Sequence, residues 1–137
     1  MINNIFLIDD DEDDLFMFKE VIESISSSLL CETALNGKIA LEVLKNRTSF
    51  PDIIFLDLNM PIMDGLDFLI QIKKEEFLKN IPVCIFTTTN TPRDKELTKE
   101  LGAISFLTKP SDFQMLRSQL EQILYADLST HEYISIA

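Results

Sequence analysis

Five short apolar runs alternate with longer amphipathic segments along this chain, and no other feature limits its possible folds so strongly. The runs are mostly free of charge and bounded by polar or turn residues, as expected of strands buried on both faces; they cover residues 5–8, 29–35, 53–56, 83–86 and 104–107. Between them, apolar residues recur at helical spacing, as at Leu15, Phe18, Ile22 and Ile25, and at Phe113, Leu116, Leu120 and Ile123. Five strand–helix units in a row predict an α/β fold in which a five-stranded parallel sheet is flanked by five helices.

Glycine and proline residues stand at the junctions between these segments, where they favour turns. Thr91 and Pro92 are typical N-cap and first-turn residues of a helix, and Gly102 is placed to end that helix. With 137 residues, the chain is long enough for one compact domain and too short for two ordinary ones. We therefore expect one domain over residues 1–125 and a short tail over residues 126–137, with no output domain.

The charge of the chain limits its partners. Acidic residues outnumber basic ones by 23 to 12, which gives a formal net charge of −11. This charge repels nucleic-acid phosphates, so we expect no direct nucleic-acid binding, whereas cations and basic protein surfaces are favoured. Cys31 and Cys84 lack CxxC spacing and are predicted to be reduced core thiols. We see no signal-peptide pattern and no apolar stretch of membrane-spanning length, and therefore expect a cytoplasmic location.

Polar residues directly follow four of the five apolar runs. In open parallel sheets, ligands bind beyond the carboxyl ends of the strands, so the residues at these ends are candidates for a shared site. They are Asp9 and Asp10 after the first run, Asp57 after the third, Thr87 after the fourth and Lys109 after the fifth. We expect three carboxylates, a hydroxyl and an ammonium group to meet at one edge of the sheet.

This set of groups has a coherent chemical use. Clustered carboxylates repel one another unless a cation neutralises them, and Mg²⁺ prefers a few carboxylates while keeping water that a phosphate oxygen can displace. A carboxylate nucleophile then takes up a phosphoryl group as an acyl phosphate. Phosphoryl transfer depends on positioning and charge neutralisation, which Mg²⁺, Lys109 and Thr87 would supply.

Structural roles also account for several of these residues when each is taken alone. The acids at residues 11–14 are expected in the first turn of a helix, where the helix dipole favours negative charge. Asp57 alone could be a turn residue before Pro61, and a single Lys-Pro pair indicates little. The combination is more specific than any of its members.

The stretch IIFLDLNMPIMDG at residues 53–65 resembles the phospho-acceptor signature of the receiver domains of two-component response regulators. Asp9 and Asp10, Thr87, Gly102-Ala103 and Lys109-Pro110 follow the order and spacing of that family, and the resemblance covers roughly residues 3–125. It implies a flavodoxin-like, doubly wound (βα)5 fold.

The resemblance also implies roles for individual residues. Asp57 would be the phospho-acceptor. Asp10, Asp57 and the backbone carbonyl of Asn59 would surround Mg²⁺, with Asp9 assisting through water.

Further residues would sense the phosphoryl group. Thr87 and Lys109 would bind its oxygens, and the Lys109–Pro110 peptide bond would be cis, since proline lowers the penalty for that isomer. Phe106 occupies the aromatic switch position of the family and would move inward as Thr87 turns toward the phosphoryl group; plain aromatic packing is the alternative for Phe106.

A receiver without an output domain would act through protein contacts. It would accept its phosphoryl group from a sensor histidine kinase or a histidine phosphotransfer protein, and then either bind a downstream protein target or relay the group onward. The output surface would involve residues 92–102 and 111–125, and a phosphorylation-dependent homodimer is left open. We expect a signalling protein and not an enzyme, apart from self-catalysed phosphorylation and dephosphorylation.

Three other functions would leave different residues in the sequence. A hydrolase of the haloacid dehalogenase type would carry a second acid at position 59, where this chain has Asn59. A flavin-binding module would have a Ser/Thr/Gly-rich phosphate loop after the first strand, where this chain places acids. The remaining alternative is a receiver-fold interaction domain that acts without phosphorylation, and it would be expected to lack the acceptor, the metal acids or the lysine.

Overall fold

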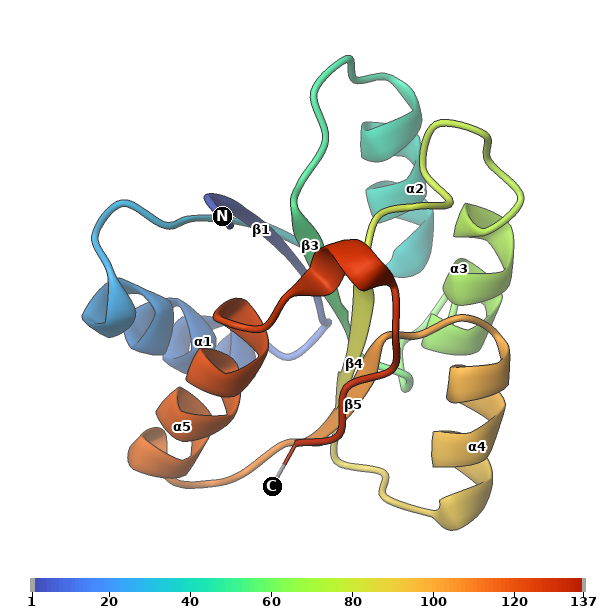
Figure 1. The fold of residues 1–137 in the computed structure, drawn as a ribbon. Helices are drawn as coiled ribbons and strands as arrows, with labels where there is room; N and C mark the ends of the chain where they lie inside the picture. The colour runs from blue at the N-terminus through green and yellow to red at the C-terminus, as the bar shows by residue number, and fades with distance from the viewer. Residues whose placement is uncertain (1, 137) are drawn as a thin grey trace.

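The five strands form one parallel sheet in the order β2-β1-β3-β4-β5 (Figure 1). This computed structural model describes residues 2–136. The strands are β1 (Asn4–Ile8), β2 (Leu30–Ala34), β3 (Ile53–Leu56), β4 (Val83–Thr87) and β5 (Ser105–Thr108). The helices are α1 (Glu12–Ile25), α2 (Gly37–Lys45), α3 (Gly65–Ile72), α4 (Pro92–Glu100) and α5 (Phe113–Leu124), followed by a 3-10 turn, η1 (Leu128–Thr130). The predicted five-stranded α/β fold is confirmed.

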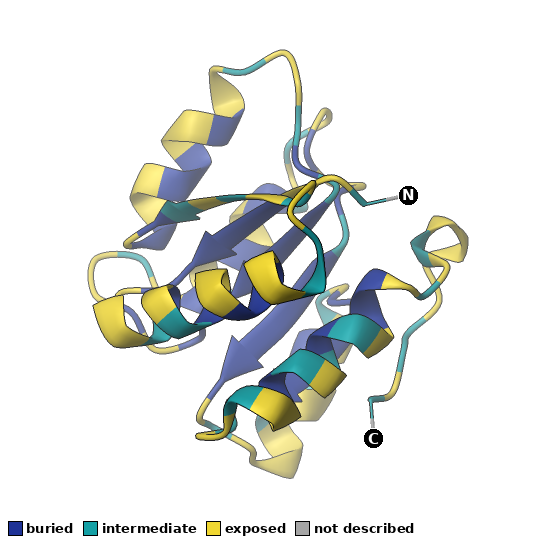
Figure 2. Cartoon of the chain, turned by 90° about the vertical axis from the view of Figure 1, so that its left-hand side faces the viewer, coloured by how far each residue is buried: buried dark blue, intermediate teal, exposed yellow. Residues whose placement is uncertain are grey.

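Side chains alternate between the two faces of the sheet, and each face has its own hydrophobic core. In β3, Ile53 and Phe55 face a core shared with α1 and α5, whereas Ile54 and Leu56 face a core shared with α2 and α3. In Figure 1, α1 and α5 lie on one side of the sheet, and α2, α3 and α4 lie on the other. Figure 2 shows the consequence: the strands are largely buried, and α1, α2, α3 and α5 each have one buried face and one exposed face. Helix α4 is more exposed, with Thr98 as its one buried residue.

The second strand departs from the expectation that every strand is buried on both faces. Leu30 in β2 is 63% exposed, whereas all five residues of β4 are buried. The sheet order explains the difference, since β2 lies at an edge and β4 lies between β3 and β5.

Cys31 and Cys84 are free thiols, as predicted, with Cys84 buried and Cys31 partly exposed. Across residues 2–136, the helices are all too short or too polar to cross a membrane.

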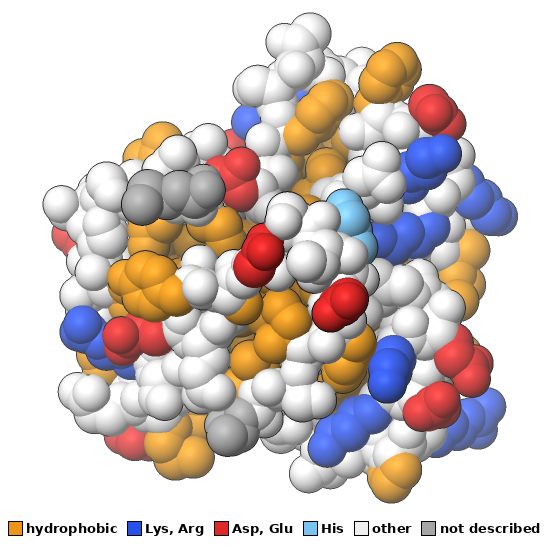
Figure 3. All heavy atoms as spheres, in the orientation of Figure 1, with side chains coloured by type: hydrophobic (Ala, Val, Ile, Leu, Met, Phe, Trp, Pro, Cys, Tyr) orange, Lys and Arg blue, Asp and Glu red, His pale blue; other side chains and the backbone are white. Residues whose placement is uncertain are grey.

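The tail after α5 folds back along β5, the other edge strand. The Ile134 amide donates to the Ile104 carbonyl at 2.8 Å, and the Ser105 hydroxyl donates to the Ile134 carbonyl. Leu128, Ile134 and Ile136 pack against the core on the α1 and α5 side. In Figure 1 the tail passes in front of β5, between α5 and α4, and Figure 3 shows the same face with all heavy atoms. The tail therefore covers apolar surface and part of an edge strand that would otherwise be open to other chains.

Deleting residues 127–137 is expected to lower the free energy of unfolding by about 2 kcal/mol, because three partly buried apolar side chains and two hydrogen bonds are lost. Urea denaturation followed by circular dichroism measures this change. Replacing the exposed Glu132 with alanine is the control and should leave stability unchanged. An unchanged midpoint for the truncated chain would show that the tail contributes no stability in solution.

Candidate functional site

Three carboxylates meet at the carboxyl ends of β1 and β3, as the sequence predicts. Asp9 and Asp57 directly follow these paired strands, and the Asp57 amide donates to the Ile8 carbonyl at 3.0 Å. One carboxylate oxygen from each of Asp9, Asp10 and Asp57 lies within 4.8 Å of the others. Asp9 and Asp57 are buried, whereas Asp10 is exposed. The pairing of the strands therefore forces negative charges together in a partly buried place.

Lys109 brings a single cation into this cluster. Its amide donates to the Thr87 carbonyl at 2.8 Å, which positions the residue beside the end of β4. Its Nζ lies 2.7 Å from Asp9 Oδ2, 2.8 Å from Asp14 Oδ2 and 3.4 Å from Asp57 Oδ2. The Lys109 side chain is 8% exposed, so these charges interact with little solvent between them.

Burial and pairing shift the pKa values in the cluster. Burial raises the pKa of Asp9 to about 6, although the close ammonium group of Lys109 acts to lower it. For Lys109, burial acts to lower the pKa, but the hydrogen bond to Asp14 and the close contact with the Asp9 carboxylate outweigh burial and raise it above its usual value. Lys109 is thus a permanent cation near pH 7, and Asp9 is a carboxylate that carries a desolvation penalty.

The arrangement suits a divalent cation. Among the residues described, Asp9 Oδ2 is buried and receives no aligned hydrogen bond, even though it lies close to Lys109. An unsatisfied buried carboxylate oxygen is unfavourable, and three carboxylate oxygens, one of them from the exposed Asp10, match the preference of Mg²⁺ for few protein ligands. Asp9, Asp10 and Asp57 therefore fit the metal that the sequence predicts.

The hydroxyl and aromatic residues lie around the same sheet edge. Thr87 is fully buried at the end of β4, and its hydroxyl accepts a long hydrogen bond of 3.5 Å from the Thr89 amide. The Asn59 side-chain amide donates to the Thr89 hydroxyl at 2.8 Å, which links the loops after β3 and β4. Phe106 is partly buried in β5, packs against the core on the α2 and α3 side, and lies 5.8 Å from Lys95 Nζ.

The loop that follows Asp57 is closely packed against its own strand. Gly65 lies so near this strand that an added Cβ would be 2.2 Å from the Asp57 carbonyl oxygen. In the same loop, Ile62 is exposed with a φ of 70°, a conformation that branched side chains rarely adopt. The loop can therefore pack this closely against the backbone of Asp57 only because residue 65 has no side chain.

Replacing Gly65 with alanine is expected to destabilise the fold by about 2 kcal/mol, because the contact is with backbone atoms that cannot swing away. The backbone displacement that this contact forces should also move Asp57 and weaken Mg²⁺ binding. Gly37→Ala is the control, since its nearest contacts are at 3.0–3.1 Å and include the flexible Met63 side chain. Chemical denaturation and Mg²⁺ titration measure both effects; equal behaviour of the two variants would contradict this account.

The prediction of a cis peptide bond before Pro110 is wrong. None of the peptide bonds among residues 2–136 is cis, so the Lys109–Pro110 bond is trans. The trans isomer of an X-Pro bond is favoured by about 0.5–1 kcal/mol in the absence of other contacts. A Lys-Pro pair in a sequence lowers the penalty for cis but does not select it.

Asp14 is the site residue that sequence reasoning missed. Residues 11–14 were expected to serve only the first turn of a helix, and Asp11 is indeed the N-cap of α1, with its side chain accepting from the Asp13 and Asp14 amides. The Asp14 carboxylate additionally accepts a hydrogen bond from Lys109. No spacing rule could have found this pair, because α1 and the end of β5 are adjacent only in the folded chain.

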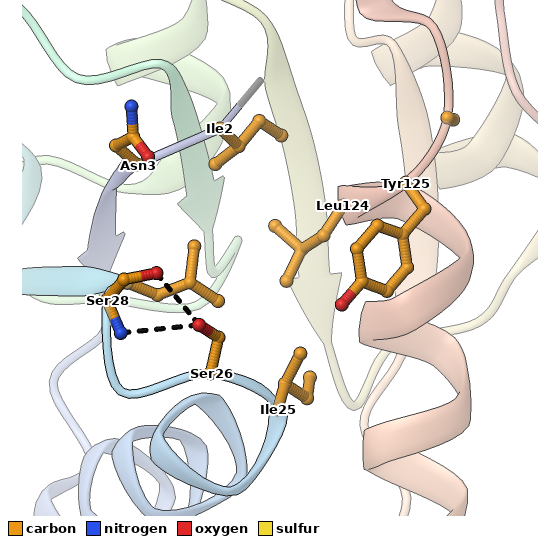
Figure 4. A pocket seen from close by; sticks show the side chains of 9 residues that line it. Ile2, Asn3, Ile25, Ser26, Ser28, Leu124 and Tyr125 are labelled. Carbon is orange, nitrogen blue, oxygen red and sulfur yellow. Dashed lines mark hydrogen bonds between the residues drawn. The ribbon is translucent and has the colours of Figure 1, made fainter.

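A pocket of about 360 Å³ lies at the other end of the sheet. Figure 4 shows Ile2 and Ile25 facing Leu124 and Tyr125 across it, with Ser26 and Ser28 hydrogen-bonded at its rim. Ile2 precedes β1, whereas Asp9 follows it. The pocket has no acidic lining residue and takes no part in the carboxylate cluster.

Comparisons with known proteins agree with the fold and the cluster. The family model described as the response regulator receiver domain matches residues 5–121. A probable cyclic di-GMP phosphodiesterase of Vibrio cholerae is 32% identical over 85% of this chain, which spans only 25% of that protein's length.

Two solved structures are similar over nearly their whole length. The phosphorylated cyanobacterial phytochrome response regulator RcpA has a TM-score of 0.84 and 29% identity, covering 95% of this chain and 96% of RcpA. The Mn²⁺-bound form of the response regulator Rcp1 has a TM-score of 0.74 and 27% identity, covering 98% of this chain and 99% of Rcp1.

Proposed function

The chain belongs to the response regulator receiver domain family, and we propose that it accepts a phosphoryl group on Asp57 and signals through protein contacts that depend on it. The observation that carries this proposal is the meeting of buried Asp57 with two further carboxylates and one buried lysine. A purely structural cluster would be expected to pair its charges evenly. Here Asp9, Asp14 and Asp57 share Lys109, and Asp10 adds a further negative charge beside them. This excess of negative charge favours a bound metal ion.

The proposed donor is a phosphohistidine of a sensor histidine kinase or a histidine phosphotransfer protein. A carboxylate oxygen of Asp57 attacks the phosphorus, the P–O bond forms, and the P–N bond to the imidazole breaks. The leaving nitrogen keeps the electron pair and is neutral once the ring has taken up a proton. Lys109 balances charge on the phosphoryl oxygens during this transfer, and the Thr87 hydroxyl donates to one of them once it has turned outward.

Four groups would hold the metal ion in this proposal. They are the carboxylates of Asp10 and Asp57, the backbone carbonyl of Asn59, and Asp9 acting through water. A bound Mg²⁺ would neutralise the carboxylates and the oxygens of the phosphoryl group. Without the metal ion, Lys109 offsets only part of the negative charge of the cluster. Burial raises the pKa of Asp9 to about 6 despite this cation.

Phe106 and α4 are the proposed route to a partner. Thr87 ends β4 and Phe106 lies beside it in β5, with Ile85 as its register partner. Lys95 of α4 lies over the Phe106 ring and Lys99 over the Tyr133 ring of the tail, and Lys and Arg side chains gather over α4 in Figure 3. A movement of Phe106 would therefore change the surface that α4 and the tail present.

The output is a protein contact in this proposal. The downstream target, an onward relay to a histidine or a phosphorylation-dependent homodimer would each use the surface of α4, β5 and α5. The cytoplasmic location stays a prediction from the sequence. The chain would be a signalling phospho-acceptor whose only reactions are its own phosphorylation and dephosphorylation.

Intact-protein mass spectrometry after incubation with Mg²⁺ and phosphoramidate tests the proposal. We expect one adduct with the mass of a phosphoryl group, which is absent when EDTA replaces Mg²⁺. If no adduct forms, binding of beryllofluoride with Mg²⁺ should be measured by ¹⁹F NMR, because small donors do not suit every acceptor. A chain that neither forms the adduct nor binds beryllofluoride would favour an interaction domain that acts without phosphorylation.

A further inference from the structure

Asp14 is a partner of Lys109 that the transfer to Asp57 does not require. Its Oδ2 accepts a hydrogen bond from Lys109 Nζ at 2.8 Å, whereas the contact from the same nitrogen to Asp57 Oδ2 is 3.4 Å. The Asp14 side chain is 36% exposed, and that of Asp9 is fully buried. The ammonium group is thus drawn toward a solvent-accessible carboxylate and lies further from the acceptor.

Phosphorylation would change what Lys109 has to bind. An ammonium group has three N–H donors and no acceptor, and three carboxylates already surround this one. A phosphoryl group on Asp57 adds three acceptor oxygens and about −1.5 to −2 charges. Lys109 therefore has to withdraw from one of its present partners in order to bind the phosphoryl oxygens.

The two other carboxylates are poor candidates for release. Asp9 is buried, and its Oδ1 is held by the Asp11 amide at 3.0 Å, so loss of the cation would leave a buried charge without compensation. Asp57 is the acceptor itself. Asp14 can exchange Lys109 for water at little energetic cost, because it is partly exposed and lies in the first turn of α1, where the helix dipole favours its charge.

We propose that Asp14 is a positioning residue that holds Lys109 in the resting form and competes with the phosphoryl group for its ammonium. This inference rests on the proposed function of Asp57. Asp14 then lowers the affinity of the site for a phosphoryl group, and phosphorylation releases its carboxylate to solvent at the start of α1. The resting state is favoured by a contact that only the folded chain creates.

The affinity for beryllofluoride, a phosphoryl analogue, tests the inference when it is measured by calorimetry in saturating Mg²⁺. Saturating metal removes any effect of the variants on Mg²⁺ binding. Asp14→Asn is expected to bind the analogue about threefold to fivefold more tightly than the unmodified chain, which corresponds to the upper part of the range for an exposed ion pair. Asp14→Glu keeps the charge and should restore the affinity of the unmodified chain.

Asp13→Asn is the matched control, because it removes the same charge from the same helical turn, and Asp13 is exposed and pairs with no basic side chain among the residues described. It should leave the affinity within about twofold. Equal affinities for the Asp13→Asn and Asp14→Asn variants would overturn the inference. Weaker binding of beryllofluoride by Asp14→Ala would also overturn it, because it would mean that Asp14 orients Lys109 toward the phosphoryl group. Failure of the unmodified chain to bind beryllofluoride would instead overturn the proposed function, and the inference with it.

Discussion

Asp57→Asn is expected to abolish the phosphoryl adduct, with a reduction of more than about 100-fold in the rate of its formation. The amide has nearly the shape of the carboxylate and can keep the hydrogen bonds of the site, but it is a far weaker nucleophile. Intact-protein mass spectrometry with Mg²⁺ and phosphoramidate measures the rate for both chains under the same conditions.

Two comparisons separate lost chemistry from lost structure. Asp67→Asn makes the same substitution on the exposed face of α3 and should be phosphorylated at the normal rate. Thermal denaturation of Asp57→Asn should show a midpoint at least as high as that of the unmodified chain, because one of three neighbouring carboxylates has lost its charge. An adduct that survives in Asp57→Asn would identify another residue as the acceptor.

Lys109→Met is expected to lower the free energy of unfolding by about 3 kcal/mol at pH 8 without Mg²⁺. The substitution removes the one cation that residues 2–136 place against a partly buried group of carboxylates. Methionine preserves most of the volume of the lysine side chain, so packing is changed little. The partly exposed Asp14 contributes little to this penalty, which comes from Asp9 and Asp57. Added Mg²⁺ should recover part of the loss.

The penalty has a definite pH dependence. The pKa of Asp9 is raised by burial from 3.8 to about 6, and Lys109 acts to lower it, so the variant should raise it further. A carboxyl group with a raised pKa in the folded state destabilises the fold when charged. The loss that Lys109→Met causes through Asp9 is therefore complete above the still higher pKa that Asp9 has in the folded variant. It shrinks as the pH falls below that pKa, and it vanishes below about 6, where Asp9 is protonated in both folded chains.

Urea denaturation at pH 5 and pH 8 measures this difference. Lys45→Met is the matched control, since Lys45 forms an exposed ion pair with Glu75 at 3.0 Å. Exposed pairs contribute about 0–1 kcal/mol, so the control should change little at either pH. A loss in Lys109→Met that is the same at both pH values would show that the buried carboxylates do not cause it.

The arrangement of the strands and the place of the site follow from the sequence because both depend on short-range patterns. The apolar runs end within one residue of the observed strands, and Thr91 caps α4, as its position before Pro92 predicts. Parallel strands necessarily bring their carboxyl ends to one edge of the sheet. Asp9, Asp10 and Asp57 could therefore be placed together without knowledge of any side-chain contact.

Only the tertiary structure decided the features that depend on contacts between distant segments. The strand order made β2 an exposed edge, and it allowed the tail to pair with Ile104 beside β5. Asp14 and Lys109 are 95 residues apart, and their contact depends on how α1 packs against the end of the sheet. The isomer of the Lys109–Pro110 bond is decided by a small free-energy difference. Periodicity and residue type determine which groups reach the sheet edge. Which carboxylates Lys109 contacts there depends on the distances between several nearby charges, and those distances exist only in the folded chain.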